Sequence, residues 1–187
     1  MSKSVPDDVL KVRESAELLF DRESVDRAVD QLAVRLSLAL VEAHPVVICV
    51  MTGGLILTAD LLKRFHFPLE VDYVHATRYD GDLVGGELRM RTTPATDVTG
   101  RTVLVVDDIF DHGTTLRAVQ RALDRLGVAS QRTAVLVVKR RKRGRRGPRV
   151  DVSGLVVDDV YVFGSGMDYR GHWRELGGVY ALAVERR

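Results

Sequence analysis

The residues best suited to chemistry lie in one short segment, residues 103–116, which reads VLVVDDIFDHGTTL. Four branched apolar residues end there at two carboxylates, Asp107 and Asp108. Such a run predicts a buried parallel strand, and the apolar spacing across residues 114–126 predicts an amphipathic helix. The junction between them is therefore expected to be a helix N-terminus at one edge of a sheet.

A helix N-terminus of this kind suits an anion. The backbone amides of residues 111–115 lack partners within the helix, Gly113 permits close approach, and the Thr114 and Thr115 hydroxyls add donors. We therefore expect a phosphate site. The plainer alternative is that Asp111 or Thr114 simply caps the helix.

The acids at the end of the strand suit a sugar. Asp107 and Asp108 offer acceptors for the vicinal hydroxyls of a ribose or, through water, for Mg²⁺. Residues that merely end a strand are again the alternative. The segment lacks both G-x-x-x-x-G-K-[ST] and G-x-G-x-x-G, so it supports neither a Walker-type ATPase nor a Rossmann dehydrogenase.

The segment closely resembles the phosphoribosyl pyrophosphate (PRPP) signature of type I phosphoribosyltransferases. In that family two acids follow a strand, and a D-x-G-x-T-like loop holds the 5′-phosphate. The resemblance extends over about residues 46–183 and is greatest to the hypoxanthine-guanine phosphoribosyltransferases, which make IMP and GMP. It implies that Asp107, Asp108 and the loop 111–115 bind PRPP, with His112 contributing backbone support. Asp111 is our candidate for exchanging a proton with N7 of the purine.

A second loop, Met51-Thr52-Gly53-Gly54, lies between an apolar strand and a helix. Its amides are expected at the same edge of the sheet, where they would suit pyrophosphate. The resembling family often has a non-proline cis peptide here, and many members have Lys at the position of Thr52, so backbone contacts matter more in this chain. A plain left-handed glycine turn is the alternative.

The glycine-rich segment 80–86 follows Arg78 and Tyr79. Composition alone favours a hairpin loop. The resemblance instead implies a loop that closes over the reacting centre and excludes water, with Tyr79 as a catalytic residue. Arg78 stands where the family usually has Ser.

Two positions are expected to hold the base. Lys139 follows the strand 133–138 and matches the family lysine that donates to O6 of the purine, which would reject adenine because the ammonium would be left unpaired. Tyr161 matches the stacking aromatic, and the backbone of Val162 would read the purine edge. The alternatives are that Lys139 is the first member of a basic run and that Tyr161 is a core aromatic.

Asp168 and Arg174 resemble the family's C-terminal pair, in which the acid holds a hydrated Mg²⁺ and the arginine holds pyrophosphate. With the amides of Thr52 and Gly53, they would stabilise the departing pyrophosphate. No covalent nucleophile is expected. The sequence has no G-x-S-x-G motif, no Cys-His pair with a free thiol and no zinc-ligand spacing, which argues against hydrolases and zinc enzymes.

The elements that must position these residues alternate between strand and helix. A helix capped by Asp21 carries five apolar residues on one face, and strands are expected at 46–52, 69–78, 87–92, 103–108 and 131–138, with two β-like segments in 153–163. This order predicts an α/β fold with a mostly parallel central sheet flanked by helices. We expect one domain over residues 1–187, with a core at about 40–150 and a small hood from about 1–39 and 152–187.

Composition fits a cytoplasmic enzyme. The chain has 187 residues, of which 45% are hydrophobic and 29% charged, and no apolar run approaches the ~20 residues needed to cross a bilayer. A signal peptide is not evident at the N-terminus, so we expect a cytoplasmic location and no membrane association. Cys49, the only cysteine, lies in an apolar run and is expected in the core.

The net charge of +2 conceals a basic run, residues 139–149, that holds eight of the 28 Lys and Arg residues and no acid. A solvated loop is the default interpretation, and RNA binding is the sharper one.

The sequence thus predicts a PRPP-dependent and Mg²⁺-dependent purine salvage transferase that acts on hypoxanthine, guanine or both. A transferase that prefers xanthine or a pyrimidine is one alternative. The other is a regulatory protein that keeps the PRPP fold and binds RNA through residues 139–149, although nucleic acid is not our leading expectation. The resemblance also implies a homodimer or homotetramer.

Overall fold

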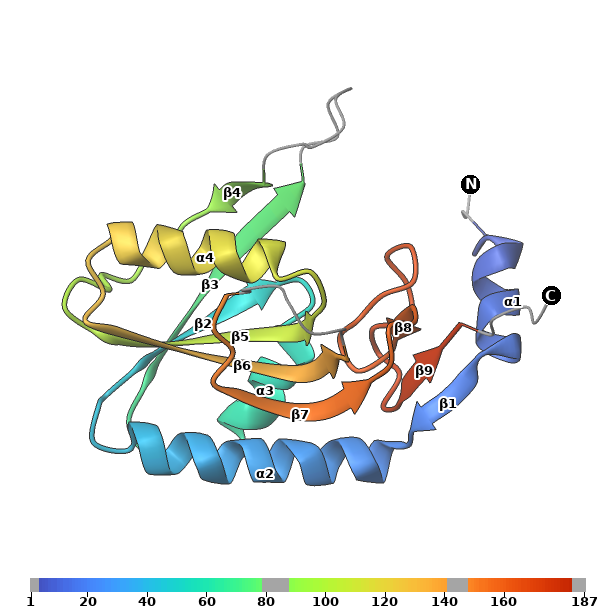
Figure 1. Cartoon of the computed structure of the whole chain (residues 1–187), viewed down its shortest axis with the longest axis horizontal. Helices are drawn as coiled ribbons and strands as arrows, with labels where there is room; N and C mark the ends of the chain where they lie inside the picture. Colours follow the sequence, from blue (N-terminus) through green and yellow to red (C-terminus); the bar gives the residue numbers. More distant parts are fainter. Residues whose placement is uncertain (1–3, 79–87, 141–147, 183–187) are drawn as a thin grey trace.

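The computed structural model describes residues 4–78, 88–140 and 148–182. Its centre is a six-stranded sheet in the order β4-β3-β2-β5-β6-β7 (Figure 1). Its strands are β2 (Val46–Met51), β3 (Glu70–Arg78), β4 (Leu88–Thr92), β5 (Thr102–Phe110), β6 (Ser130–Lys139) and β7 (Val152–Val157). All neighbouring strands are parallel except β3 and β4. The mostly parallel sheet expected from the sequence is confirmed.

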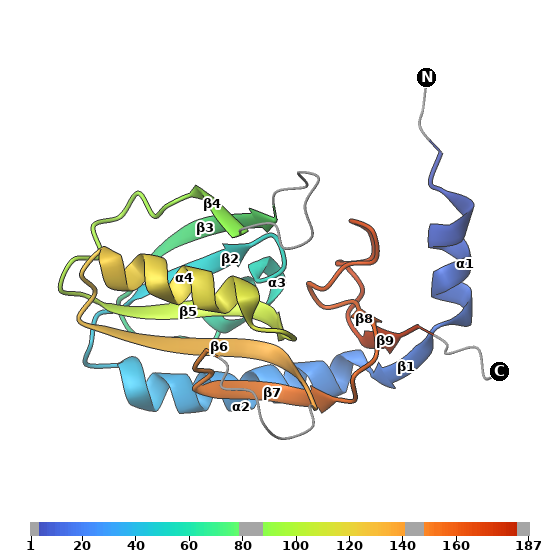
Figure 2. The same cartoon turned by 45° about the horizontal axis from the view of Figure 1, so that its top comes forward.

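Helices cover both faces of this sheet, as Figures 1 and 2 show. Helices α2 (Arg22–Leu40) and α3 (Leu55–Leu62) lie on one face, and α4 (Thr114–Arg125) lies on the other. The strand residues alternate accordingly: Val47 and Leu104 pack with α2 and α3, whereas Val46 and Ile48 pack with α4. Burial on both faces explains why β2 and β5 are almost continuously apolar.

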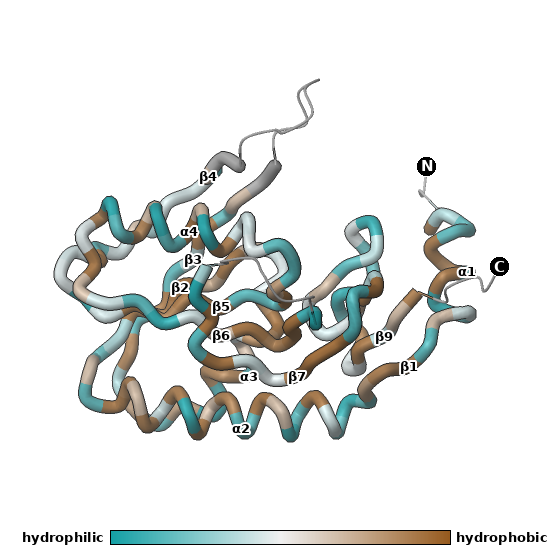
Figure 3. Tube along the Cα trace, viewed as in Figure 1, coloured by the Kyte–Doolittle hydropathy of each residue, from teal (hydrophilic) through white to brown (hydrophobic). Residues whose placement is uncertain are grey.

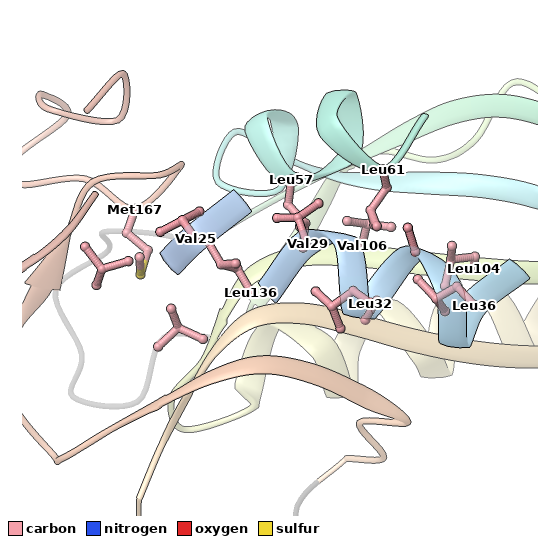
Figure 4. Close-up of a cluster of buried hydrophobic side chains, with 14 of the residues drawn as sticks. Val25, Val29, Leu32, Leu36, Leu57, Leu61, Leu104, Val106, Leu136 and Met167 are labelled. Carbon is pink, nitrogen blue, oxygen red and sulfur yellow. The ribbon is translucent and has the colours of Figure 1, made fainter. Parts of the chain in front are cut away.

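Helix α2 forms for reasons that are visible in its sequence. The Asp21 side chain accepts a hydrogen bond from the Ser24 amide at 2.8 Å, which caps the N-terminus as expected. One side of the helix is apolar, so the trace alternates in hydropathy in Figure 3. Figure 4 shows Val29, Leu32 and Leu36 from this stripe against the sheet and α3.

A smaller antiparallel sheet forms beside the core, in the order β1-β9-β8. It consists of β1 (Glu17–Phe20), β8 (Val162–Phe163) and β9 (Val179–Ala181), and α1 (Asp7–Ser15) lies next to it (Figure 2). This small sheet joins the N-terminal and C-terminal parts of the chain and is the expected hood.

The boundary between core and hood differs from the expectation that residues 1–39 and 152–187 form the hood. Helix α2 packs on β6 and β7, and β7 is itself a parallel strand of the central sheet. The apolar stripe of α2 is buried against one face of the central sheet as well as against α3, and β7 supplies part of that sheet face. Both elements therefore belong to the core.

Two further expectations concern the interior. Cys49 is buried within β2, so its assignment to the core is confirmed. In the part of the chain that the structure describes, no helix is long and apolar enough to cross a membrane.

The packing of α2 is tested by two leucines on opposite sides of it. Leu36 is 1% exposed and Leu38 is 81% exposed. We expect Leu36→Ala to lower the free energy of unfolding by about 2–5 kcal/mol, because it leaves a cavity, and Leu38→Ala to lower it by less than about 0.5 kcal/mol. Urea denaturation of both variants measures this difference, and equal losses would contradict the packing of α2 on the sheet.

Candidate active site

Most of the expected site residues gather around one cavity at the carboxyl edge of the central sheet. The cavity has a volume of about 360 Å³. The end of β5, the turn after β2, the start of α4 and the loop between β8 and β9 all contribute to its wall. Ligands of parallel α/β sheets bind at this edge, because the loops that follow the strands converge there.

The first wall of the cavity is the N-terminus of α4. Its N-cap residue is Gly113, which has φ of 69° and no side-chain capping bond. A Cβ atom at Gly113 would lie 2.6 Å from the Phe110 ring and from Pro148, so only glycine fits. Neither Asp111 nor Thr114 caps the helix, and the capping alternative is wrong. The amides at this end line the cavity, where an anion can accept from them.

The residues of this loop differ in exposure. Gly113 is buried, whereas His112 and Thr114 are exposed and Asp111 and Thr115 are half-buried. All five residues line the cavity. His112 Nδ1 lies 3.1 Å from Asp111 Oδ1, and its ring points to solvent, as expected of a residue that contributes mainly through its backbone.

The second wall is formed by Asp107 and Asp108, which lie within β5 rather than after it. Each carboxylate accepts a hydrogen bond from the backbone amide of the next residue: Asp107 Oδ1 from Asp108 at 3.0 Å, and Asp108 Oδ1 from Ile109 at 2.7 Å. Burial raises the pKa of Asp107 well above its usual value, and the neighbouring Asp108 charge raises it further. Burial also raises the pKa of Asp108.

The third wall is the turn after β2, where the Met51–Thr52 peptide is cis. Gly53 and Gly54 have no positive φ, so the alternative of a left-handed glycine turn is wrong. They are required for close approach: a Cβ at Gly53 would overlap the Asp108 carboxylate, and one at Gly54 would lie 2.4 Å from the Val106 carbonyl oxygen. Gly53 lines the cavity, whereas the exposed Thr52 is not among its lining residues.

The hood closes the cavity with Asp168 and Arg174. Arg174 Nη2 lies 2.6 Å from Asp168 Oδ1, and Arg174 Nη1 donates to the Gly166 carbonyl oxygen at 2.6 Å. The same guanidinium is 3.9 Å from Asp108 Oδ2, so it lies between hood and core. No role was predicted for Gly166 from the sequence. The available sequence signal was the Gly-Ser-Gly run 164–166, and both of its glycines have positive φ in the structure.

Lys139, the last residue of β6, is directed at the loop 111–115. Its side chain is 11% exposed, and its Nζ lies 3.2 Å from Asp111 Oδ2 and 3.9 Å from Asp159 Oδ1. A buried ammonium that pairs with carboxylates is not a solvated member of a basic run, so that alternative is wrong for Lys139. Asp159 was not anticipated, since no periodic pattern marks it.

Tyr161 lies just before β8 and is 46% exposed, so it is not a core aromatic. Its hydroxyl donates to the Asp168 carbonyl oxygen at 2.8 Å, and its ring meets Tyr169 edge to face. Val162, which follows, is buried and pairs with Ala181 of β9. Lys139 and Tyr161 do not line the cavity themselves. Each donates a hydrogen bond to a residue that does, Lys139 to Asp111 and Tyr161 to Asp168.

Some expected residues cannot be placed. Tyr79 and the glycine-rich segment 80–86 lie outside the described residues, as does 141–147 of the basic run. The two described arginines of that run pair with acids: Arg140 with Asp158 at 3.3 Å and Arg149 with Asp151 at 2.6 Å.

Comparison with known proteins identifies the family of this fold and cavity. Residues 15–170 match the family model described as the phosphoribosyl transferase domain. The chain belongs to the phosphoribosyltransferase family. The resemblance read from the PRPP signature is therefore confirmed, and the central sheet with its hood is the phosphoribosyltransferase fold.

Named relatives of the phosphoribosyltransferase family match most of the chain. A hypoxanthine-guanine-xanthine phosphoribosyltransferase of Tritrichomonas foetus is 32% identical over 159 residues, which cover 85% of this chain and 87% of the relative. A hypoxanthine-guanine phosphoribosyltransferase of Bacillus subtilis (strain 168) is 30% identical over 161 residues, 85% of this chain and 88% of the relative. A solved hypoxanthine-guanine-xanthine phosphoribosyltransferase superimposes with a TM-score of 0.82 at 29% identity, covering 90% of this chain and 98% of that one.

The buried acids should lower stability at neutral pH. Because the pKa of Asp107 is raised on folding, the native state binds more protons than the unfolded state above the usual carboxyl pKa of 3.8, and stability falls as pH rises. Asp107→Asn should therefore raise the thermal unfolding midpoint at pH 7.5, and the gain should shrink towards pH 4. Scanning calorimetry across this range measures it. A gain that is constant with pH would contradict the raised pKa.

Proposed function

We propose that this phosphoribosyltransferase moves the 5-phosphoribosyl group from PRPP to N9 of hypoxanthine, guanine or both, giving IMP or GMP and pyrophosphate. The observation that carries the proposal is the adjacency of Lys139 Nζ and Asp111 Oδ2, 3.2 Å apart beside the phosphate loop. It is a donor next to an acceptor. The 6-oxopurines present the complementary pair on one edge, since O6 accepts a hydrogen bond and N7–H donates one.

This pair favours 6-oxopurines over other bases. Adenine has an amino group in place of O6, so it would set a donor against the mostly buried Lys139 ammonium, which is also a donor and would gain no acceptor from the base. A pyrimidine has no atom equivalent to N7. The pair does not contact position 2 of the ring, where hypoxanthine, guanine and xanthine differ, so xanthine belongs among the bases to be tested. The names of the relatives from Bacillus subtilis and Tritrichomonas foetus support the same substrate class.

In this proposal PRPP lies across the cavity. Its 5′-phosphate accepts from the amides at the start of α4 and from Thr114 and Thr115. Its ribose hydroxyls donate to Asp107 and Asp108, which replaces the water that burial removed from these carboxylates. Its pyrophosphate meets the Gly53 amide and the Arg174 guanidinium, and the main chain of Thr52 supports that turn.

The carboxylates around the cavity also fit Mg²⁺. Asp168 would hold a hydrated ion, with Asp107 and Asp108 acting indirectly. In the described part of the chain no three acidic, histidine or cysteine side chains are close enough to form a complete metal site. This suits Mg²⁺, which usually binds through one or two carboxylates together with substrate phosphates and water. When bound, Mg²⁺ neutralises the charge that develops on the departing pyrophosphate.

The chemical step needs no covalent nucleophile. The bond from the anomeric carbon to the pyrophosphate oxygen breaks, the bond to N9 forms, and the base loses a proton. Arg174 and the amides at Gly53 stabilise the negative charge that develops on pyrophosphate. Asp111 accepts the proton from N7, Lys139 holds O6, the Tyr161 ring stacks on the base, and the Val162 backbone reads its edge. Tyr79, to which the family resemblance gives a catalytic role, lies outside the described residues.

Pyrophosphate release with PRPP and Mg²⁺ tests the proposal directly. Hypoxanthine, guanine, xanthine, adenine and uracil are offered separately. We expect turnover only with 6-oxopurines and a loss of kcat of about 10²- to 10⁴-fold in Asp111→Asn, since this variant cannot accept the N7 proton. If no base supports turnover while PRPP still binds, the transferase proposal is wrong.

Base discrimination is tested at Lys139. Lys139→Gln keeps a neutral donor but loses the ammonium, so kcat/KM for hypoxanthine should fall by about 10- to 100-fold, as is typical for one charged hydrogen bond. The preference over adenine should shrink. Arg140→Gln is the matched control, because Arg140 is the next residue and its side chain is 72% exposed. Equal losses in both variants would refute a specific role for Lys139.

A further inference from the structure

The hydroxyl of Tyr161 has a partner that stacking on a base does not require. It donates to the backbone carbonyl oxygen of Asp168 at 2.8 Å, although a stacking ring needs only its face. The ring of Tyr169 packs edge to face on the same ring, with 6.0 Å between the two ring centroids and the two planes nearly perpendicular. The hydroxyl is therefore committed to the main chain of the hood loop.

The hood loop between β8 and β9 is tightly folded on itself. It is the red-orange segment that rises between the central sheet and α1 in Figures 1 and 2. Antiparallel bridges join Gly164 to Met167 and Tyr169 to His172. Asp168 is at the centre of this loop, and its Oδ2 accepts from the Gly171 amide at 2.7 Å.

Asp168 thus has two connections of different kinds. Its carbonyl oxygen accepts a hydrogen bond from the hydroxyl of Tyr161, whose ring is assigned to the base. Its carboxylate is paired with Arg174, which is assigned to pyrophosphate. A shift of the main chain at Asp168 would displace its carboxylate and the guanidinium paired with it. The hydroxyl of Tyr161 is placed to prevent that shift.

We propose that the Tyr161 hydroxyl is a positioning group that holds Asp168 and Arg174 in place for the pyrophosphate half of the substrate. This inference rests on the proposed function of the same site and deepens it. The Tyr161 ring serves the base, whereas its hydroxyl serves the other half of the reaction.

Loss of the hydroxyl should leave the loop folded, because α1 holds its far side. Arg170 Nη1 pairs with Asp8 at 2.5 Å, and Trp173 Nε1 donates to the Val9 carbonyl oxygen at 2.8 Å. These contacts do not involve Tyr161. Tyr161→Phe therefore removes one tether from a loop that keeps its other anchors.

Steady-state kinetics of Tyr161→Phe test the inference. We expect KM for PRPP to rise by about 2- to 12-fold, the range for one net hydrogen bond, while KM for hypoxanthine changes by less than about twofold because the ring remains. Tyr161→Leu removes the ring as well as the hydroxyl, so KM for PRPP should rise as in Tyr161→Phe and KM for hypoxanthine should rise with it. Tyr169→Phe is the matched control: it also removes a tyrosine hydroxyl next to Tyr161, and it should change neither value.

Calorimetric titration with magnesium pyrophosphate gives a readout without turnover. The affinity of Tyr161→Phe should fall by a factor similar to the rise in KM for PRPP. Unchanged pyrophosphate affinity, or a rise in KM for hypoxanthine alone, would overturn the inference. If the unaltered protein transfers no phosphoribosyl group, the proposed function fails. The titration still shows whether the Tyr161 hydroxyl supports an anion site at Arg174.

Discussion

Two adjacent carboxylates, Asp107 and Asp108, are buried near the carboxyl end of β5, and the guanidinium of Arg174 lies 3.9 Å from Asp108 Oδ2. Burial of two like charges opposes folding, which the extensive apolar core on both faces of the sheet must offset. The main-chain amides of Asp108 and Ile109 compensate part of the cost. The absence of side chains at Gly53 and Gly54 then lets the turn after β2 approach this pair.

The sequence allowed much of this site to be predicted, because its key signals are local. The apolar run before Asp107, the helix after Gly113 and the cap at Asp21 depend on residues within one or two turns of each other. The gathering of Asp107, Asp108 and the loop 111–115 at one sheet edge follows from parallel topology. Chain order and the PRPP signature were therefore sufficient for the family.

Other features depend on contacts between distant residues and left no periodic signal. The pairing of Lys139 with Asp111 spans 28 residues. Assignment of α2 and β7 to the core rather than the hood depends on which surface buries the apolar stripe of α2, and several surfaces would satisfy the same pattern. The Tyr161 hydroxyl bond depends on how the hood loop folds back, which glycines permit but do not specify.

Among the residues that the structure describes, the two cations placed at the site are already paired with acids before any substrate arrives. Arg174 is paired with Asp168 and Lys139 with Asp111, while Asp107 and Asp108 add further acidic groups. The described part of the site therefore presents little positive potential to an approaching polyanion such as PRPP, and its residues give electrostatic steering little to act on. An anion that binds there must displace Asp168 from Arg174 or Asp111 from Lys139, so an exchange of ion-pair partners follows contact.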